Sequence, residues 1–591
     1  MEQTYRFRYA SETQDCGVIL YDKGTGSEIR RIPFPEENRI GKINRLNVPA
    51  QSIGKKCIYQ FYDGENKYPD PEGKLFCAAK KYGEAKGLED IYTILDLPEF
   101  DWQGTQRPKV PYEESLIYCL HVRGFTKHIS SGVKARGTFS GIIEKIPYLK
   151  EIGVTTLEFQ PIYEFNERPK LMHNWTTGME ETPRLNYWGY TQGYYYAPKA
   201  DYAKEDAMTE CKKMIRELHK NGMEAVLQFY FSAEFNPMDI PPILRYWVEE
   251  YRVDGFHLIG ENLPADFIAK DAELSDTKIW YYQWDVSKIF GKNKLPKQKT
   301  LGLVRDDFLY DVRRFLKGEE GMISAMMYQL RSVPPVIGRI HYLTTYWGFT
   351  LMDMVSYDFK HNEANGEDNH DGTDYNCSWN CGEEGFSRKK KIQKLRLTQI
   401  KNALCFLFFS QSTPKIFMGD EFGNSQKGNN NPYCQDNETA WLNWKNLEKN
   451  QEIYQFFKKM VDFRSKNDIL RPSKENQMMD TISCGYPDLS FHGMTAWRPQ
   501  MEHSSRQLGV MYCGKYGKKS EEEFIYLAMN MHWEAHSLAL PRLPKGEEWV
   551  PLFATNEEMK NAAFGQDMVR ILPKTVAVFV SRKGKNEKQE A

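Results

Sequence analysis

The sequence predicts an α/β fold in which a (β/α)₈ barrel is flanked by two β-sandwiches. The barrel is predicted from helix-like runs that lead into short apolar strands, as residues 243–250 lead into the strand within 251–261. The sandwiches are predicted from short alternating segments near both ends of the chain. Because 591 residues exceed what one core can bury, we expect separate domains at 1–105, 106–465 and 466–591.

The first predicted element is a small antiparallel sandwich over residues 1–105. Its segments are short and alternating, such as Cys-Ile-Tyr-Gln-Phe-Tyr at 57–62, and Asp-Gly and Pro-Asp-Pro turns separate them. A Pro-rich crossing at 107–112 leads into the barrel. Short strands return beyond about residue 470, including the one at 524–531, and they predict the second sandwich.

Strands and helices alternate through the predicted barrel. Strands are expected at 116–122, 155–161, 224–231, 251–261, 278–285 and 414–421. Helices are expected at 142–149, 211–220, 243–250 and 392–409. The second of these helices is predicted to end at Asn221-Gly222, a common way to terminate a helix.

Long motifs in this chain resemble glycoside hydrolase family 13 of the α-amylase superfamily, and within it the isoamylase and glycogen-debranching enzymes. The motifs are Arg-Tyr-Trp-Val at 245–248, Val-Asp-Gly-Phe at 253–256, His-Asn-Glu-Ala-Asn-Gly-Glu-Asp-Asn at 361–369, Ser-Trp-Asn-Cys-Gly at 378–382 and Tyr-Cys-Gln-Asp-Asn at 433–437. The resemblance runs from about residue 55 to the end of the chain. It implies the three-part architecture predicted above, and it assigns 306–318 to the helix that follows the fifth strand.

The residues that carry catalysis in that family are replaced in this chain. The resemblance puts the nucleophile at Ile259, the general acid at Tyr282 and the third carboxylate at Trp347. Retaining hydrolysis needs two carboxyl groups about 5–5.5 Å apart, and isoleucine cannot form a glycosyl intermediate. Tyrosine, with a reference pKa near 10, is a poor acid at neutral pH. We therefore expect an inactive homologue with no catalytic residue at these positions.

The region after the third strand departs from the family too. The polar positions that line the sugar site in the family correspond here to Gln228, Ser232 and Ala233. Family members also have a long substrate-binding loop at this point, whereas residues 234–242 lead almost at once into the next helix. Both the residues and the loop that hold substrate are therefore expected to be missing.

Other carboxylates are candidates to replace the missing ones. Glu261 lies two residues after Ile259, on the same side of an extended chain, and Asp285 follows the fifth strand. The alternatives are that Glu261 caps the next turn and that Asp285 occupies a family position other than the acid. Glu158, in the second strand, is a third candidate, with an ion pair to a neighbouring cation as its alternative. We favour the structural roles, because an error of about 1 Å in placement costs about 10²-fold in rate.

The aromatic replacements allow two interpretations of the old cleft. His257, Tyr282, Tyr346 and Trp347 either fill the vacated space or form a surface on which sugar rings stack. Filling is favoured, because a buried unpaired carboxylate is costly and its loss stabilises a barrel. The short segment 234–242 also removes one wall of the cleft.

The N-terminal sandwich is the other candidate glucan site. Its segment 61–76 resembles the starch-binding-type module that precedes the barrel in isoamylases, and Tyr59, Tyr62 and Tyr68 are its candidate sugar-binding residues. The alternative is that the module only packs on the barrel. We expect any binding of glycogen to be weak and to lie mainly on residues 1–105.

Composition limits the partners of the chain. The 79 basic and 80 acidic side chains almost balance, so neither nucleic acid nor an anionic membrane is expected as a partner. The first residues lack a signal-peptide pattern and the 11 cysteines are odd in number and scattered, so a cytoplasmic location is expected. Cys377 and Cys381 form the one close pair, without the further ligands that zinc needs. No cofactor or metal is expected.

Three functions remain open at this point. The leading one is an isoamylase-like protein of α-glucan metabolism that is inactive and acts by binding glycogen or maltodextrin, or by partnering an active debranching enzyme. The alternative is an active α-1,6-glucosidase that uses relocated carboxylates. A third is an interaction scaffold with no glucan ligand.

Overall fold

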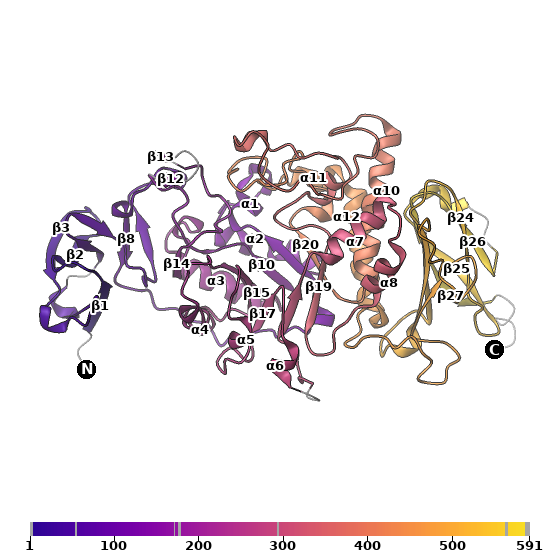
Figure 1. The fold of residues 1–591 in the computed structure, drawn as a ribbon, viewed down its shortest axis with the longest axis horizontal. Coiled ribbons are helices and arrows are strands. Elements are labelled where there is room, and N and C mark those ends of the chain that lie inside the picture. Colours follow the sequence, from indigo (N-terminus) through magenta and orange to yellow (C-terminus); the bar gives the residue numbers. More distant parts are fainter. Residues whose placement is uncertain are drawn as a thin grey trace.

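The computed structural model describes residues 4–53, 56–170, 172–174, 179–181, 183–291, 295–561 and 565–584. Figure 1 shows an elongated molecule with a β-rich domain at each end and a barrel surrounded by helices in the middle. Among the described residues, no helix combines the length and the apolar character needed to cross a membrane.

The middle of the chain forms a closed barrel of parallel strands. Going round the barrel, the order is β10-β15-β16-β17-β18-β19-β20-β9. In chain order the strands are β9 (Ile117–Leu120), β10 (Thr156–Phe159), β15 (Glu224–Tyr230), β16 (Gly255–Ile259), β17 (Lys278–Tyr281), β18 (Leu301–Val304), β19 (Gly338–Tyr342) and β20 (Thr413–Phe417). The predicted (β/α)₈ barrel is therefore confirmed.

Helices connect the strands and cover the barrel (Figure 1). They are α1 (Val122–Lys127), α2 (Phe139–Glu151), α3 (Ala207–Lys220), α4 (Ile240–Tyr251), α5 (Ala265–Ile268), α6 (Val286–Phe290), α7 (Asp307–Lys317), α8 (Ile323–Arg331), α9 (Leu351–Met354), α10 (Lys390–Phe409), α11 (Lys445–Lys449) and α12 (Gln451–Lys466). Local chemistry sets their ends: the Asp206 side chain accepts the N–H of Met208 at the start of α3. Asn221 ends this helix and Gly222 follows with φ of 73°, as predicted.

One helix assignment is wrong. The helix predicted at 306–318 is α7, and it follows the sixth strand β18 rather than the fifth. Strand β18 has only the sequence Leu-Gly-Leu-Val, which is too short to give a periodic signal. Its Gly302 packs against the ring of Trp280, where a Cβ atom would lie 2.5 Å from Cδ1. A side chain would therefore clash where the two neighbouring strands meet.

The N-terminal part is an antiparallel sandwich, as predicted. One sheet has the order β3-β2-β5-β8-β7 with β6 beside β5, and the other pairs β1 with β4. The strands are β1 (Thr4–Ala10), β2 (Cys16–Asp22), β3 (Glu28–Pro33), β4 (Ile43–Pro49), β5 (Cys57–Asp63), β6 (Asn66–Tyr68), β7 (Phe76–Ala78) and β8 (Ile91–Ile94). Phe7 and Leu46 of the small sheet pack against Val18 and Phe61 of the large one.

The C-terminal part is a second antiparallel sandwich, also as predicted. Its large sheet has the order β21-β22-β23-β27-β25, and β24 pairs with β26. The strands are β21 (Leu489–His492), β22 (Gln507–Cys513), β23 (Phe524–Asn530), β24 (His536–Ala539), β25 (Glu547–Ala554), β26 (Met568–Ile571) and β27 (Thr575–Lys583). Leu508 and Val578 of the large sheet share one apolar core with the barrel helices, so this sheet packs on the barrel.

A buried charge cluster joins the N-terminal part to the barrel. The Lys86 ammonium lies 2.7 Å from Glu167 Oε1 and 3.2 Å from Asp201 Oδ2. The Lys199 ammonium lies 2.7 Å from Glu164 Oε1 and 3.0 Å from Glu167 Oε2. Buried ions of this kind are costly when one partner is lost, so the cluster holds the two domains in one relative position. With this contact included, we propose 1–105, 106–465 and 466–591 as the domain limits.

Candidate functional site at the mouth of the barrel

A cleft of about 1040 Å³ opens where several barrel strands end. Tyr230 ends β15 and Ile259 ends β16, and both line it. Tyr346 and Trp347, in the loop after β19, line the cleft as well. This carboxyl end of the strands is where barrel enzymes of this type carry their active sites.

Aromatic rings form one wall of the cleft. The rings of Tyr190 and Tyr346 are stacked, with centroids 4.6 Å apart and planes 26° apart. Trp188 meets Tyr346 edge-on at 5.4 Å and Tyr433 edge-on at 6.5 Å. The sequence analysis did not assign the loop carrying Trp188 and Tyr190 to the site. Its signal was the run Asn-Tyr-Trp-Gly-Tyr at 186–190, with three aromatic residues in five.

A buried ion cluster lies in the barrel interior beneath the cleft. Glu158 Oε1 lies 2.6 Å from Nδ1 of His257 and accepts the amide N–H of Gln228 at 2.8 Å. The Lys415 ammonium lies 3.2 Å from Glu158 Oε2 and 4.3 Å from the centre of the Tyr342 ring. Burial opposes ionisation of Glu158, but Lys415 and His257 outweigh it and hold the pKa of this carboxyl below its ordinary range.

The cluster gives structural partners to two residues named in the sequence analysis, Gln228 and Glu158. Gln228 replaces a sugar-binding residue of the family, and here its amide oxygen accepts the hydroxyl of Tyr190 while its amide nitrogen binds Glu158. Glu158 forms the ion pair that was its structural alternative. Lys415 was not recognised from the sequence, because a lysine within an apolar strand gives no sign of the partner that it will meet.

The four predicted cleft residues separate into three environments. Tyr346 and Trp347 line the cleft, whereas the side chain of His257 is mostly buried against Glu158. Tyr282 lies outside the lining residues, half exposed, and packs on the ring of Tyr281 at 4.4 Å. The favoured interpretation, that these residues fill the cleft, stays a prediction. The stacked rings stand along one side and leave open space beside them.

The segment after the third strand is as short as predicted. β15 ends at Tyr230 and α4 begins at Ile240, so only residues 231–239 connect them. Phe231 and Phe235 of this segment pack on each other at 5.1 Å rather than extending over the cleft.

The carboxylates proposed as stand-ins take structural or exposed positions. Asp285 caps α6, accepting the N–H of Lys288, and lies 3.0 Å from the Lys288 ammonium. Hydrogen bonds from Ser287 and Lys288 lower its pKa to about 2, so it is not an acid at neutral pH. Glu261 is exposed. Neither belongs to the lining of the cleft.

The predicted tyrosines of the N-terminal sandwich do not form a sugar-binding surface. Tyr59 is buried in the sandwich core and donates its hydroxyl to Asp70 at 2.7 Å. Tyr62 is buried too, with the Arg31 guanidinium 4.8 Å above its ring. Tyr68 is half-buried beside Tyr9. The short alternating segment of β5 does not reveal this burial. Both faces of the strand are covered, because its side chains belong to two apolar clusters on opposite faces.

Three carboxyl groups near the barrel have raised pKa values and were missed by the sequence analysis. Burial raises the pKa of Glu421 to about 7 and the pKa values of Asp420 and Asp353 to about 6. Glu421 accepts the hydroxyls of Tyr118 and Tyr148 at 2.8 and 2.6 Å. All three are fully buried and bonded to protein groups, so they stabilise loops and have no access to a substrate.

The described residues include one group that could hold a metal ion, and it lies in the C-terminal sandwich. It consists of His532, Glu534 and His536. Nδ1 of His532 already accepts the backbone N–H of Glu534, so one nitrogen of this ring has a partner within the protein. Cys377 and Cys381 are both buried and belong to no such group.

Comparison with known proteins places this barrel in a family. A family model described as the catalytic domain of α-amylase matches residues 105–233. Isoamylase 3 of rice (Oryza sativa subsp. japonica), a chloroplastic protein, is 31% identical over 585 residues, which cover 85% of this chain and 72% of that protein. The glycogen operon protein GlgX homolog of Mycobacterium bovis is 32% identical over 598 residues, covering 83% of this chain and 81% of that protein. The chain belongs to the isoamylase and glycogen-debranching group of the α-amylase superfamily.

Solved structures share the isoamylase-type architecture along nearly the whole chain. A pullulanase from Paenibacillus barengoltzii, in complex with maltohexaose and α-cyclodextrin, superposes with a TM-score of 0.69 at 17% identity and covers 98% of this chain and 94% of its own. At this identity the match shows the fold alone.

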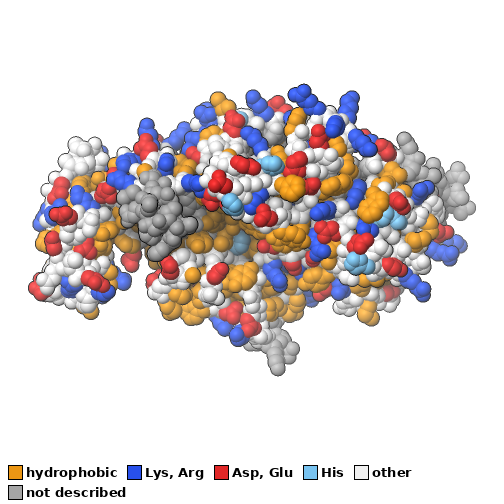
Figure 2. Space-filling model, turned by 45° about the horizontal axis from the view of Figure 1, so that its top comes forward, with side chains coloured by type: hydrophobic (Ala, Val, Ile, Leu, Met, Phe, Trp, Pro, Cys, Tyr) orange, Lys and Arg blue, Asp and Glu red, His pale blue; other side chains and the backbone are white. Residues whose placement is uncertain are grey.

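On the face of the molecule in Figure 2, acidic and basic side chains are interspersed and hydrophobic ones gather over the middle.

Proposed function

We propose that this isoamylase-type chain binds α-glucan at the mouth of its barrel and does not hydrolyse it. The observation that carries the proposal is the position of Ile259 at the end of β16, in the wall of the cleft, where the family resemblance requires a nucleophilic carboxylate. An aliphatic side chain cannot form or stabilise a glycosyl intermediate. The relatives named above are isoamylases and glycogen-operon proteins, which supports an α-glucan as the ligand.

The carboxylates around the cleft support the loss of catalysis. Among the described residues that line it, Glu167 is the one carboxylate, and its side chain is buried between Lys86 and Lys199. Burial opposes its ionisation, but the two lysines lower the pKa of Glu167 to about 2, so it can neither donate a proton nor attack a sugar freely. Glu158 is held beneath the cleft by Lys415 and His257. Retaining hydrolysis needs a pair of carboxyl groups with separate roles, about 5–5.5 Å apart, and these residues do not supply it.

The aromatic wall supports the retention of binding. Sugar rings stack on flat aromatic faces, and Tyr190, Tyr346 and Trp347 all line the open space of the cleft. Arg184 and Asn186 line the same cleft and offer hydrogen-bond donors to hydroxyl groups. A second candidate, an active glucosidase with relocated carboxylates, has no support from the positions of Asp285 and Glu261.

Two measurements on the purified full-length chain test the proposal. Incubation with glycogen and limit dextrin is expected to release no reducing ends above the buffer blank. Turnover that is abolished by Asp285→Asn or Glu261→Gln would overturn the loss of catalysis. In a glycogen pull-down the chain is expected to be retained, with weaker retention for Trp347→Ala and unchanged retention for the matched control Tyr282→Ala, whose ring lies outside the cleft.

The same pull-down separates glucan binding from a partner role. If the chain is not retained by glycogen but is captured by an active debranching enzyme, the ligand of this fold is a protein and the glucan proposal is wrong. Retention that Trp347→Ala leaves intact would place the glucan elsewhere on the molecule and would refute the cleft as the binding site.

A further inference from the structure

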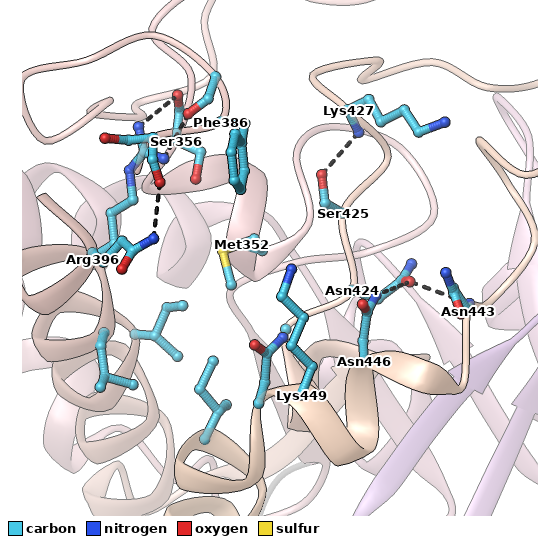
Figure 3. Close-up of a pocket in the computed structure, with 18 of the residues that line it drawn as sticks. Met352, Ser356, Phe386, Arg396, Asn424, Ser425, Lys427, Asn443, Asn446 and Lys449 are labelled. Carbon is cyan, nitrogen blue, oxygen red and sulfur yellow. Dashed lines mark hydrogen bonds between the residues drawn. The ribbon is translucent and has the colours of Figure 1, made fainter. Parts of the chain in front are cut away.

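A second groove, of about 670 Å³, lies among the helices and loops that follow β19 and β20 (Figure 3). Its walls come from the segments after β19 and β20 and from helices α10, α11 and α12. It shares no lining residue with the cleft at the mouth of the barrel. A ligand bound here would therefore not depend on the residues of that cleft.

The floor of the groove is apolar and an aromatic ring stands over it. Met352, Leu397, Ile400 and Ile453 contribute the floor. The ring of Phe386 is 73% exposed, and Figure 3 shows it pointing towards Met352 across the groove. An exposed phenylalanine that faces a cavity offers a flat apolar surface to a ligand.

A buried arginine fixes the loop that carries this ring. Arg396 donates to the carbonyl oxygen of Gly385 at 2.6 Å and to that of Asn380 at 3.0 Å. The Gly385 N–H donates to the backbone carbonyl oxygen of Ser356 at 2.7 Å. Nε of Arg396 has no hydrogen-bond partner among the described residues, and this side chain lines the groove. These buried contacts fix the backbone next to Phe386, so the ring is carried at the groove by an anchored loop.

Side-chain amides line the other side of the groove. Asn424, Asn443, Asn446 and Asn450 all belong to its lining. The amide nitrogen of Asn446 and the backbone N–H of Asn443 reach the amide oxygen of Asn424 only at 3.4 Å. Within the described part of the chain, the amide nitrogen of Asn424 and the amide oxygen of Asn446 have no partner. The groove therefore presents a free donor and a free acceptor next to its apolar floor.

Two lysines complete the rim. Lys449 points from α11 up into the groove in Figure 3, and Lys427 stands in the loop after β20. Neither forms an ion pair within the described residues. Lys427 has φ of 60°, a conformation that non-glycine residues seldom adopt, and its N–H donates to the hydroxyl of Ser425 at 2.9 Å. The loop thus holds this side chain at the rim through a defined turn.

We infer that this groove is a second α-glucan site that takes a short malto-oligosaccharide segment. A glucose ring offers a C–H face to an aromatic surface and hydroxyl groups at its edge, each able to donate and to accept. Phe386 matches the face, and the amides and the two ammonium groups match the edge. The inference rests on the proposed function, in that it takes α-glucan as the ligand of this chain.

The test is isothermal titration of the full-length chain with maltohexaose in a Trp347→Ala background, which weakens the cleft. Phe386→Ala is expected to reduce the remaining affinity at least fivefold, and Asn446→Ala is expected to reduce it as well. Phe359→Ala is the matched control: this ring is also 73% exposed, lies outside the groove, and its loss should change nothing. Unaltered unfolding temperatures show that the variants are folded.

The outcomes separate this inference from the proposed function. Binding that Trp347→Ala abolishes and Phe386→Ala leaves intact overturns the groove site alone. Turnover of glucan combined with Phe386-dependent binding overturns the proposed function alone. Absence of maltohexaose binding in every variant and in the unaltered chain overturns both. A groove that binds inorganic phosphate in a Phe386-independent way, but not maltohexaose, is an anion site and refutes the glucan assignment.

Discussion

The substitution Glu158→Gln is expected to destabilise the barrel strongly. It leaves the Lys415 ammonium buried without its counter-ion, whereas the amide oxygen of the new side chain still accepts hydrogen bonds from Gln228 and His257. At 3.2 Å and an effective dielectric constant of about 20, the lost attraction is about 5 kcal/mol. Breaking one side of a buried pair costs about 3–5 kcal/mol in measured cases.

Scanning calorimetry of the barrel transition measures the effect. For a domain of this size a loss of about 3–5 kcal/mol lowers the Tm by roughly 4–7 °C. The double variant Glu158→Gln/Lys415→Met removes both charges while it keeps the side-chain volumes, and it is expected to recover most of the loss. A Tm shift below about 2 °C for Glu158→Gln, or a double variant as unstable as the sum of the singles, would refute the buried pair.

The pH dependence follows from the lowered pKa of Glu158. A carboxyl whose pKa is lower in the folded state than in the unfolded state stabilises the fold above the unfolded value, about 4.3 for Glu. This stabilisation is lost as the pH falls below that value. The Tm difference between the unaltered chain and Glu158→Gln is therefore expected to be full at pH 7 and to shrink below about pH 4.

Two further predictions concern other parts of the fold. Lys86→Met should cost about 2–4 kcal/mol at pH 7, because Glu167 and Asp201 lose a buried cation. The fold lowers the pKa of Glu167 to about 2, so the stabilisation from this carboxylate is lost as the pH falls from about 4 towards 2. Calorimetry at about pH 7 and pH 3 should therefore show a smaller loss at the lower pH, and equal losses at both would contradict the ionic origin. Gly260→Ala should lower the Tm by several degrees, because Gly260 has φ of 144° and a Cβ atom would lie 2.3 Å from the carbonyl oxygen of Phe231. Gly26→Ala is the control: Gly26 also has a positive φ, but no atom lies near its Cβ position, so this variant measures the cost of the backbone conformation alone. An unchanged Tm for Gly260→Ala would show that the chain relaxes there.

The sequence by itself determined the architecture. Apolar strands such as β16 and capped helices such as α3 are local patterns, so their positions follow from neighbouring residues. Long motifs carried the family, and with it the positions of Ile259 and Trp347, which the structure places in the wall of one cleft. The short strand β18 was missed because four residues with a glycine carry almost no periodic signal.

The tertiary structure alone decided what each side chain of the candidate sites does. Tyr59 and Trp347 are both aromatic residues in or beside strands, yet one is buried in a sandwich core and the other lines an open cleft. Lys415 and Glu158 are 257 positions apart in the sequence, and only barrel closure brings them within 3.2 Å. Burial and ion pairing depend on contacts between distant segments, whereas sequence patterns report on near neighbours, so the chemistry of a site is settled only when the chain is folded.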